Sequence, residues 1–345
     1  MFLMVSDRHP QSTMSAAFLW SPYHARLHHT LRQRGLFSRK QSMLIAVSGG
    51  QDSLCLAQLL LDLQPHWEWR IEIAHCNHRW RPDADDNAAY VQSLAEAWQV
   101  PYHGRTAAEP IPSEAAARDW RYAVLKEIAR REGLDCVVTG HTASDRAETL
   151  LYNLIRGSGA DGLQALTWNR PLSDSIRLVR PLLDFLRSET AQVCQDRQLE
   201  VWYDATNDDV TYARNRIREE LLPYLQEHLN PRVEAHLGQT AELLRADVAL
   251  LEELATTVRK QASSPDSPYA LNRQVLKNAP LALQRRVVRQ FLQGLLPASP
   301  TYEQVEKVVR LILAPNRSQT DPLSGGAIAR VEQDWIQLQS RESNY

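Results

Sequence analysis

Short apolar runs alternate with longer amphipathic segments along the N-terminal part of the chain. Apolar runs rich in β-branched residues predict buried strands, and segments with apolar residues three and four positions apart predict helices. The strands are expected at 43–47, 69–74, 100–105, 135–140 and 178–183. The helices are expected at 24–39, 54–61, 83–99, 114–131 and 188–198. This alternation predicts an α/β domain with a doubly wound, mainly parallel sheet.

The pattern changes beyond residue 217, where helical periodicity dominates. A turn-rich linker follows at 261–268, then a basic amphipathic helix at 281–296, a further helix at 302–313 and a small hairpin at 325–338. We therefore expect three parts: an N-terminal extension with a leading helix at 1–39, a nucleotide-binding domain at 40–217, and a smaller, mostly helical domain at 218–345. Met1 and Met14 are both candidate start residues.

Composition narrows the class of protein only a little. The 345 residues carry a formal net charge of −2, so a nucleic-acid partner requires a local basic face. The four cysteines (Cys55, Cys76, Cys136 and Cys194) are widely spaced, which argues against a disulfide framework or structural zinc and favours a reducing compartment. No apolar run approaches the length of a membrane span, and no signal peptide is evident. We expect a cytoplasmic protein without a membrane partner, and a homodimer remains an open alternative to a monomer.

The segment from Ser48 to Ser53 is the first candidate for chemistry. It reads Ser-Gly-Gly-Gln-Asp-Ser and joins a buried strand to a helix, which is a geometry that binds phosphate through backbone N–H groups and the helix dipole. The candidate ATP-binding residues are Ser48, Gly49, Gly50, Gln51, Asp52 and Ser53. Asp52 is expected to bind the Mg²⁺ that the phosphates share, because a carboxylate repels phosphate directly. The alternative is an ordinary turn with helix-capping residues.

Three other groups of residues follow strand ends or share a helix face. Asp145 and Glu148 lie three apart at the start of a helix, where they can hold a cation or an amine or simply complement the helix dipole. The loop after the second strand carries His75 and His78, which predict a site, a solvated loop or, less well, zinc ligands. Arg118 lies on a helix face that also suits ordinary ion pairs. Three arginines suit an anion or RNA backbone as well as a solvated helix start: Arg214, Arg216 and Arg218.

The Ser48–Ser53 segment resembles the signature of the PP-loop ATP pyrophosphatases, and the chain more narrowly resembles the tRNA(Ile)-lysidine synthases. Further motifs carry the narrower resemblance in order along 43–223: 74–78, 114–122, 139–149, 156–159, 180–183 and 204–218. One departure is clear. That family usually has two successive aspartates after the fourth strand, and this chain has Ser144-Asp145, followed by Arg146 in place of a frequent glutamine.

The resemblance implies an adenine nucleotide alpha hydrolase-like fold and a specific reaction. ATP adenylates O2 of the wobble cytidine in a tRNA(Ile) with a CAU anticodon, pyrophosphate leaves, and L-lysine then attacks C2 and displaces AMP. The product, lysidine, changes decoding to AUA and charging to isoleucine. Asp52, Asp145 and Glu148 are the implied catalytic residues, of which the last two would bind or deprotonate the lysine amine. Cytidine or nucleotide contacts are assigned to His75, His78 and Arg118, and tRNA contacts to Arg214, Arg216, Arg218 and the C-terminal domain.

Three rival interpretations share parts of this pattern. A PP-loop tRNA thiolase needs sulfur carriers, usually catalytic cysteines or an iron–sulfur cluster, and the isolated cysteines argue against one. An amide-forming ligase fed by ammonia would carry a glutaminase, which this sequence does not show. A non-catalytic nucleotide-binding regulator is disfavoured because Asp52, Asp145 and Glu148 are all retained.

Overall fold

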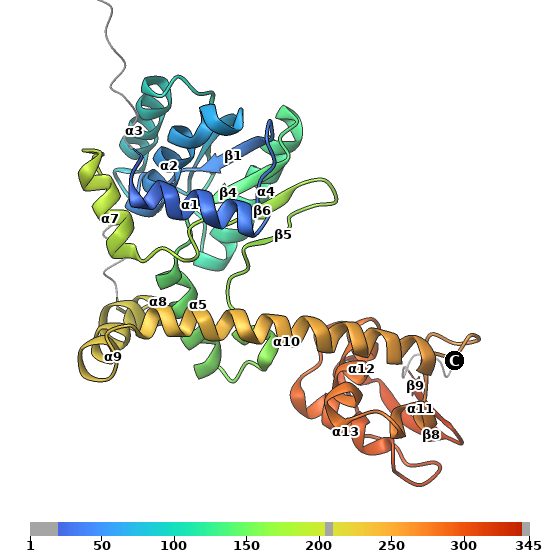
Figure 1. The fold of residues 1–345 in the computed structure, drawn as a ribbon. Coiled ribbons are helices and arrows are strands. Elements are labelled where there is room, and N and C mark those ends of the chain that lie inside the picture. The colour runs from blue at the N-terminus through green and yellow to red at the C-terminus, as the bar shows by residue number, and fades with distance from the viewer. Residues whose placement is uncertain (1–19, 204–209, 340–345) are drawn as a thin grey trace, which may run out of the picture. The chain divides into compact units, whose positions relative to one another are not determined.

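A computed structural model describes residues 20–203 and 210–339 (Figure 1). The candidate start residues, and the 204–209 part of the motif at 204–218, lie outside the described residues. The chain divides into two compact units, Met1–Ala241 and Glu242–Tyr345. The first unit extends beyond the expected boundary at 217/218 because apolar side chains of the following segment pack on it. Ile217, Leu222 and Leu237 form one cluster with Ala147.

The first unit is built on a six-stranded sheet in the order β3-β2-β1-β4-β6-β5. Its strands are β1 (Ser42–Ala46), β2 (Arg70–Asn77), β3 (Tyr102–Thr106), β4 (Cys136–Thr139), β5 (Asn169–Pro171) and β6 (Arg177–Val179). All neighbouring strands pair in parallel except β5, which is antiparallel to β6. The strand order reverses beside β1, so the loops after β1 and β4 leave the same edge of the sheet side by side. Ligands bind at such a switch point in open α/β sheets.

Helices cover both faces of this sheet, as the sequence predicts. They are α1 (Pro22–Gln33), α2 (Gln51–Trp67), α3 (Ala84–Ala97), α4 (Glu114–Glu132), α5 (Ala143–Ile155), α6 (Ala160–Leu163) and α7 (Arg187–Asp196). Successive residues of β1 point to opposite faces. Met43 and Ile45 pack in the core with residues of α1, α2, α3 and α7, whereas Leu44 packs in a second core with Leu125 and Ile128 of α4. The doubly wound fold class is therefore confirmed.

The chain then becomes helical, through α8 (Ala213–Arg216), a π-helical turn (Ile217–Leu221), α9 (Leu222–His228) and the long α10 (Val233–Ala262). The second unit holds α11 (Arg273–Lys277), α12 (Leu281–Gln293), α13 (Tyr302–Leu311), a 3-10 turn (Ser324–Gly326) and the strands β7 (Ala270–Asn272), β8 (Ile328–Glu332) and β9 (Trp335–Gln339). The expected hairpin is β8–β9, and β7 adds a third strand to it that the sequence pattern did not indicate.

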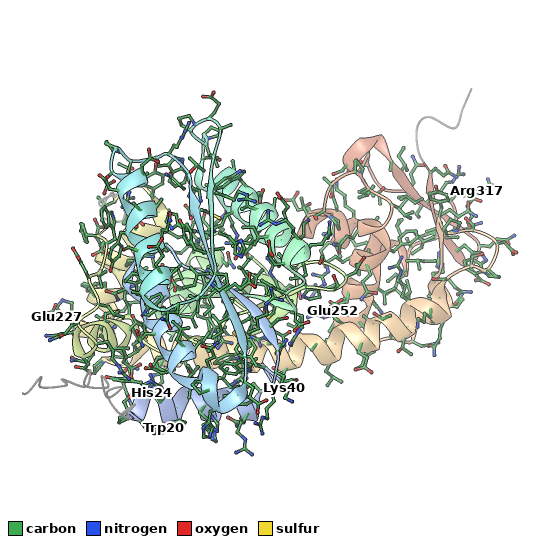
Figure 2. The ribbon with its side chains drawn as sticks, turned by 90° about the horizontal axis from the view of Figure 1, so that it is seen from above. Trp20, His24, Lys40, Glu227, Glu252 and Arg317 are labelled. Carbon is green, nitrogen blue, oxygen red and sulfur yellow. The ribbon has the colours of Figure 1, made fainter. Side chains whose placement is uncertain are left out.

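Arginines on α12 are the basic residues expected to mark the second unit. In the structure they are engaged with carboxylates of the same unit. Arg285 pairs with Glu306 at 2.6 Å, and Arg286 and Arg289 pair with Glu252 at 2.5 and 2.6 Å. Glu252 is labelled in Figure 2. These ion pairs hold α10, α12 and α13 together, so part of the basic charge of the 281–296 segment serves packing within the unit. No described helix in either unit has the length and apolar character required to cross a membrane.

Candidate active site

The turn between β1 and α2 begins the site. Gly49 has φ +87°, a backbone conformation that favours glycine, and Gly50 is the N-cap of α2. The Ser53 hydroxyl donates to the Gly50 carbonyl at 2.8 Å and accepts the Ser48 N–H at 3.1 Å, and the two serine hydroxyls lie 3.2 Å apart. Both hydroxyls thus stabilise the turn while they line the cavity described below. The backbone of Ser48 is further anchored by Asn87, whose amide donates to its carbonyl at 3.0 Å.

Two glycines let other segments approach this turn closely. A Cβ on Gly140, after β4, would lie 2.7 Å from the backbone oxygen of Asp52. A Cβ on Gly49 would lie 2.4 Å from the Asn87 side-chain oxygen. Real Cβ atoms are not found at such distances from backbone, so the loop after β4 can lie against the phosphate turn only because residue 140 has no side chain. This contact brings the two strand ends into one site.

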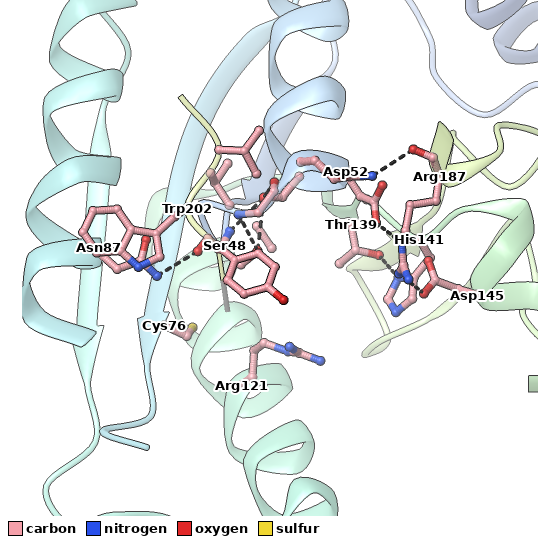
Figure 3. A pocket seen from close by; sticks show the side chains of 18 of the residues that line it. Ser48, Asp52, Cys76, Asn87, Arg121, Thr139, His141, Asp145, Arg187 and Trp202 are labelled. Atoms are coloured by element: carbon pink, nitrogen blue, oxygen red, sulfur yellow. Dashed lines mark hydrogen bonds and ion pairs between the residues drawn. The ribbon is translucent and has the colours of Figure 1, made fainter. Parts of the chain in front are cut away.

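A cavity of about 530 Å³ opens over the turn, and Figure 3 shows its lining. Ser48, Gly50, Gln51, Asp52 and Ser53 line one side of it. Another side is lined by Thr139, the last residue of β4, and by His141 and Asp145, which follow it. Other lining residues come from farther along the chain, namely Arg187, Val201, Trp202, Tyr203, Arg218 and Glu219. The structure therefore brings Asp52 and Asp145 together in one cavity, as the strand order predicts.

Arg187, the first residue of α7, lies between the two aspartates. Its Nε is 3.3 Å from Asp52 Oδ2, its Nη2 is 3.3 Å from Asp145 Oδ1, and its Nη1 is 3.5 Å from Glu148 Oε1. Asp52 also accepts a hydrogen bond from the Thr190 hydroxyl, and Asp145 accepts two from Thr142 that complete a capping box for α5. One guanidinium is thus shared by three carboxylates.

The two aspartates differ in the direction of their pKa shifts. Burial raises the pKa of Asp52, although the positive charge of Arg187 opposes this, and the nearby charge of Asp145 adds to the rise. Burial also acts to raise the pKa of Asp145, but the charge of Arg187 and the hydrogen bonds from Thr142 hold that pKa below its usual value. Asp145 is therefore the more strongly ionised of the pair.

Glu148 does not lie where its expected role, binding or deprotonation of the lysine amine, would require. It is 2% exposed and does not line this cavity or the adjoining one. Its two oxygens accept from Nε and Nη2 of Arg218 at 2.7 and 2.8 Å, which is a bidentate pair of the strong kind. Arg218 in turn lines the cavity. Because its guanidinium is hydrogen-bonded to Glu148, it does not extend freely toward an RNA backbone. The carboxylate and the arginine act here as one unit.

An adjoining cavity of about 250 Å³ lies beside the first and shares Ser48, His78 and Arg121 with it, among other residues. The candidates His75, His78 and Arg118 all line it. Its lining is strongly basic and includes Arg79, Arg81, Arg118, Arg121 and Arg214. The His75 ring is 4% exposed and its Nδ1 lies 2.9 Å from the Val47 carbonyl, so it holds the end of β1 to β2. Burial lowers the pKa of His75, which favours the neutral ring.

The three arginines of the 214–218 segment separate into different environments. Arg214 lines the adjoining cavity and donates to Thr149 at 3.0 Å. Arg216 is exposed and donates to the Val210 carbonyl at 3.1 Å. Arg218 is the partner of Glu148. The structure thus brings Arg214 and Arg218 to the cavities, whereas Arg216 lines neither.

Sequence reasoning missed two residues of this site. Arg187 directly precedes the helix expected at 188–198 and is distant in sequence from both aspartates, so only the fold brings it to them. His141 follows directly after Gly140 at the strand end, and that position could have suggested it. Its Nδ1 lies 2.9 Å from the Thr139 hydroxyl, and burial lowers its pKa to about 3, so the ring is neutral near pH 7 even beside Asp145.

Ser144 stands where the resembled family usually has an aspartate, and the structure shows what its hydroxyl does. It is 5% exposed, donates to Glu234 Oε2 at 2.6 Å and accepts the backbone N–H of Arg187 at 3.2 Å. Glu234 lies at the start of α10 and also accepts from Gln226 at 3.0 Å. A carboxylate thus lies beside this position, supplied by Glu234, and the hydroxyl ties α5 to α7.

We expect Ser144→Asp to destabilise the protein by about 1–2 kcal/mol, because it would place a second carboxylate against Glu234 in a buried position. Adding Glu234→Gln should restore most of that loss, since an amide can donate to the new carboxylate. Urea unfolding of the single and double variants measures both effects. Ser93→Asp, on the exposed face of α3, is the control and should change stability by less than about 0.5 kcal/mol. Full stability of Ser144→Asp with Glu234 intact would contradict this account.

The donor set at the phosphate turn suits Mg²⁺ in one particular way. Among the described residues, no group of three or more histidine, cysteine or acidic side chains could hold a metal ion by itself. Mg²⁺ is commonly bound by one or two carboxylates together with substrate phosphates. Asp52, with Asp145 in the same cavity, matches that requirement, and the remaining ligands would be phosphate oxygens and water.

Fold and site together define a PP-loop protein: a glycine turn after the first strand, an aspartate at its helix start, and a second acidic helix start across the switch point. In agreement, the family model described as the PP-loop domain matches residues 21–225, and the TilS substrate binding domain matches residues 271–336. The chain is also similar to a solved U34-tRNA thiolase from Methanococcus maripaludis, with a TM-score of 0.54 and 16% identity over 64% of this chain and 77% of that one. That likeness concerns the fold alone.

Closer relatives narrow the family. The chain is 56% identical to the tRNA(Ile)-lysidine synthase of a Nostoc species, over 94% of this chain and 98% of that protein. It is 51% identical to the one of a Synechocystis species, over 92% and 97%, and 33% identical to the chloroplastic one of Zygnema circumcarinatum, over 85% and 80%. The chain belongs to the tRNA(Ile)-lysidine synthase family.

Proposed function

We propose that this protein ligates L-lysine to C2 of the wobble cytidine of a CAU-anticodon tRNA(Ile), with ATP converted to AMP and pyrophosphate and lysidine as the product. The observation that carries the proposal is that the PP-loop turn, with its Asp52, and Asp145 line the same cavity, in a chain that belongs to this family. The carbonyl oxygen of cytidine is a poor leaving group, and transfer of AMP to it makes displacement by an amine feasible.

The PP-loop turn is the proposed site for the ATP phosphates. Backbone N–H groups at the start of α2, with the hydroxyls of Ser48 and Ser53, offer donors to phosphate oxygens. Asp52 would hold Mg²⁺, which when bound supplies positive charge to the phosphates and the departing pyrophosphate. Gln51 is proposed to act indirectly, because its amide donates to the Arg187 carbonyl at 2.8 Å and to Thr190 at 3.2 Å.

Asp145 is the proposed group that binds and orients the lysine ε-ammonium. It lines the cavity, and its lowered pKa keeps it ionised. A base must also take a proton from the amine before attack, and Asp145 is suitably placed for that as well. Glu148 is proposed to support this step through Arg218 rather than by contact with lysine, since it lines neither cavity.

The adjoining basic cavity is the proposed site for the tRNA side of the reaction. Arg118 and Arg121 line it, and their guanidinium carbons lie 5.6 and 5.7 Å from the centroid of the Tyr122 ring. His78 there lies against Trp80 and Trp120, with ring centroids 5.6 and 5.2 Å apart, so aromatic surface accompanies the charge. Positive charge beside aromatic rings suits an unstacked nucleotide and its phosphate. The TilS substrate binding domain match in the second unit supports further tRNA contacts.

The decisive test mixes the purified protein with ATP, labelled L-lysine and a transcribed tRNA that carries a CAU anticodon. We expect label to enter the wobble position together with stoichiometric release of AMP and pyrophosphate. Elongator tRNA(Met), which shares the anticodon, is the matched control and should accept little label. Absence of label from tRNA(Ile) would refute the proposal. A thiolase would instead introduce sulfur, and the four cysteines here are free thiols, three of them buried, with no trio placed to hold a metal.

The free thiols also suit a reducing compartment, and on this ground we propose a cytoplasmic location.

A further inference from the structure

The guanidinium of Arg187 lies in the cavity beside the two aspartates that the proposed reaction assigns to Mg²⁺ and to lysine. We propose that the guanidinium of Arg187 is a phosphate ligand: it occupies the space between Asp52 and Asp145 only in the nucleotide-free enzyme, and it turns onto the ATP phosphates when they arrive. This inference rests on the proposed function for the identity of the nucleotide. It adds a residue and a conformational step that neither the motifs nor the family match assigns.

The first argument is the looseness of its ion pairs. The three contacts of Arg187 with Asp52, Asp145 and Glu148 measure 3.3, 3.3 and 3.5 Å. Charge-assisted hydrogen bonds between nitrogen and carboxylate oxygen are typically about 2.7–2.9 Å. Arg218 reaches that range with Glu148, at 2.7 and 2.8 Å, in the same site. Arg187 is therefore held by the general field of three carboxylates rather than by an optimised pair, and such contacts are easily exchanged.

The second argument is that its backbone is fixed while its side chain is free to turn. The Arg187 carbonyl accepts from Gln51 at 2.8 Å, and its N–H donates to Ser144 at 3.2 Å. These bonds attach the start of α7 directly to the PP-loop turn and to α5. The side chain is 30% exposed and lines the cavity with the phosphate-binding residues, as Figure 3 shows for Arg187 and Asp52. Rotation about side-chain bonds is enough to change its partner.

The third argument is charge balance. In the proposed reaction, Mg²⁺ requires Asp52 and the lysine ammonium requires Asp145, so both cations compete with the guanidinium for the same oxygens. ATP brings the negative charge that can receive the displaced guanidinium. Its planar, forked donors match two phosphate oxygens at once. When pyrophosphate leaves, the Arg187 guanidinium would stabilise the negative charge that develops on it. One rotation thus frees two carboxylates and supplies a cation to the phosphates.

The test compares Arg187→Gln with the unmodified enzyme in two binding measurements that need no turnover. For a non-hydrolysable α,β-methylene ATP analogue with Mg²⁺, we expect the dissociation constant to rise about 10-fold or more, equivalent to at least about 1.4 kcal/mol. For Mn²⁺ without nucleotide, followed by electron paramagnetic resonance, we expect binding to tighten about 3-fold or more, because a competing cation has been removed. Only the combination of weaker nucleotide and tighter metal binding supports the proposal. Unchanged nucleotide binding, or unchanged or weaker metal binding, overturns it.

Two further variants keep the test interpretable. Arg187→Lys retains a positive charge among the carboxylates, which protects the fold, but it lacks the forked donors, so its affinity for the analogue should be intermediate. Arg197→Gln is the matched control: Arg197 follows the same helix, pairs with Asp62 at 2.8 Å and has a side chain 31% exposed, but it does not line the cavity. Both of its constants should equal those of the unmodified enzyme. The lysidine assay on unmodified protein tests the proposed function separately, so failure of one is distinguishable from failure of the other.

Discussion

Replacing Asp52 with asparagine is expected to lower AMP and pyrophosphate release by at least about 10²–10³-fold, the cost of removing one preorganised electrostatic group from an active site. Asparagine has nearly the same shape, and its side-chain oxygen can still accept the Thr190 hydroxyl. What it lacks is the charge that would hold Mg²⁺ beside the phosphates. The measurement is release of radiolabelled pyrophosphate from ATP in the presence of tRNA and lysine. Because the substitution preserves packing, the thermal unfolding midpoint should change little.

Asp62→Asn is the control for this experiment. Asp62 lies on the same helix, is hydrogen-bonded to His24 at 3.0 Å and forms an ion pair with Arg197 at 2.8 Å, but it does not line the cavity. We expect it to lower stability without lowering turnover per folded molecule. Normal pyrophosphate release by Asp52→Asn would remove the metal assignment. An equal loss of turnover in both variants would show that the assay reports damage to α2 rather than chemistry at the turn.

The parts of this site that could be predicted from sequence are those built by neighbouring residues. A buried strand, two glycines and a helix start lie within a few positions in the Ser48–Ser53 segment, so the turn is a local property of the chain. That Asp52 and Asp145 meet follows from one more rule, that the carboxyl ends of neighbouring parallel strands lie at the same edge of the sheet. The structure places both in one cavity, as that rule requires.

The parts that could not be predicted depend on partners far apart in sequence. Arg187 is 135 positions from Asp52 and 42 from Asp145, and nothing in its local sequence indicates that one guanidinium would face both. The close approach of Gly140 to the Asp52 backbone is likewise invisible until the two loops are packed. Glu148 is the most instructive residue. Its spacing from Asp145 correctly placed it on the same helix face, but that face is covered by Arg218, which lies 70 positions later. Spacing identifies neighbours along a helix and does not identify what covers them.

Glu148→Gln is expected to destabilise the first unit by about 2–3 kcal/mol, because it leaves the half-buried guanidinium of Arg218 with only the longer, 4.0 Å contact to Asp145 as a charged partner. If Glu148 acts through Arg218, then Glu148→Gln, Arg218→Gln and the double variant should lower turnover by similar factors. The double variant should then regain about 1–2 kcal/mol of the summed loss in urea unfolding, which is the signature of a coupled pair. All three variants should leave the KM for lysine nearly unchanged.

The rival interpretation, in which Glu148 contacts lysine itself, predicts different effects of the two single variants on the KM for lysine and on stability. Glu148→Gln would then raise the KM for lysine about 10-fold while Arg218→Gln would not, and the unfolding free energies would show little coupling. Glu72→Gln is the matched control, because Glu72 is equally buried at 2% exposure and is paired with His103 at 2.7 Å, yet does not line the cavity. Glu72→Gln should lower the free energy of unfolding and leave turnover and the KM for lysine unchanged. Since Asp145 lines the cavity and Glu148 does not, we expect the lysine KM to respond to Asp145→Asn instead.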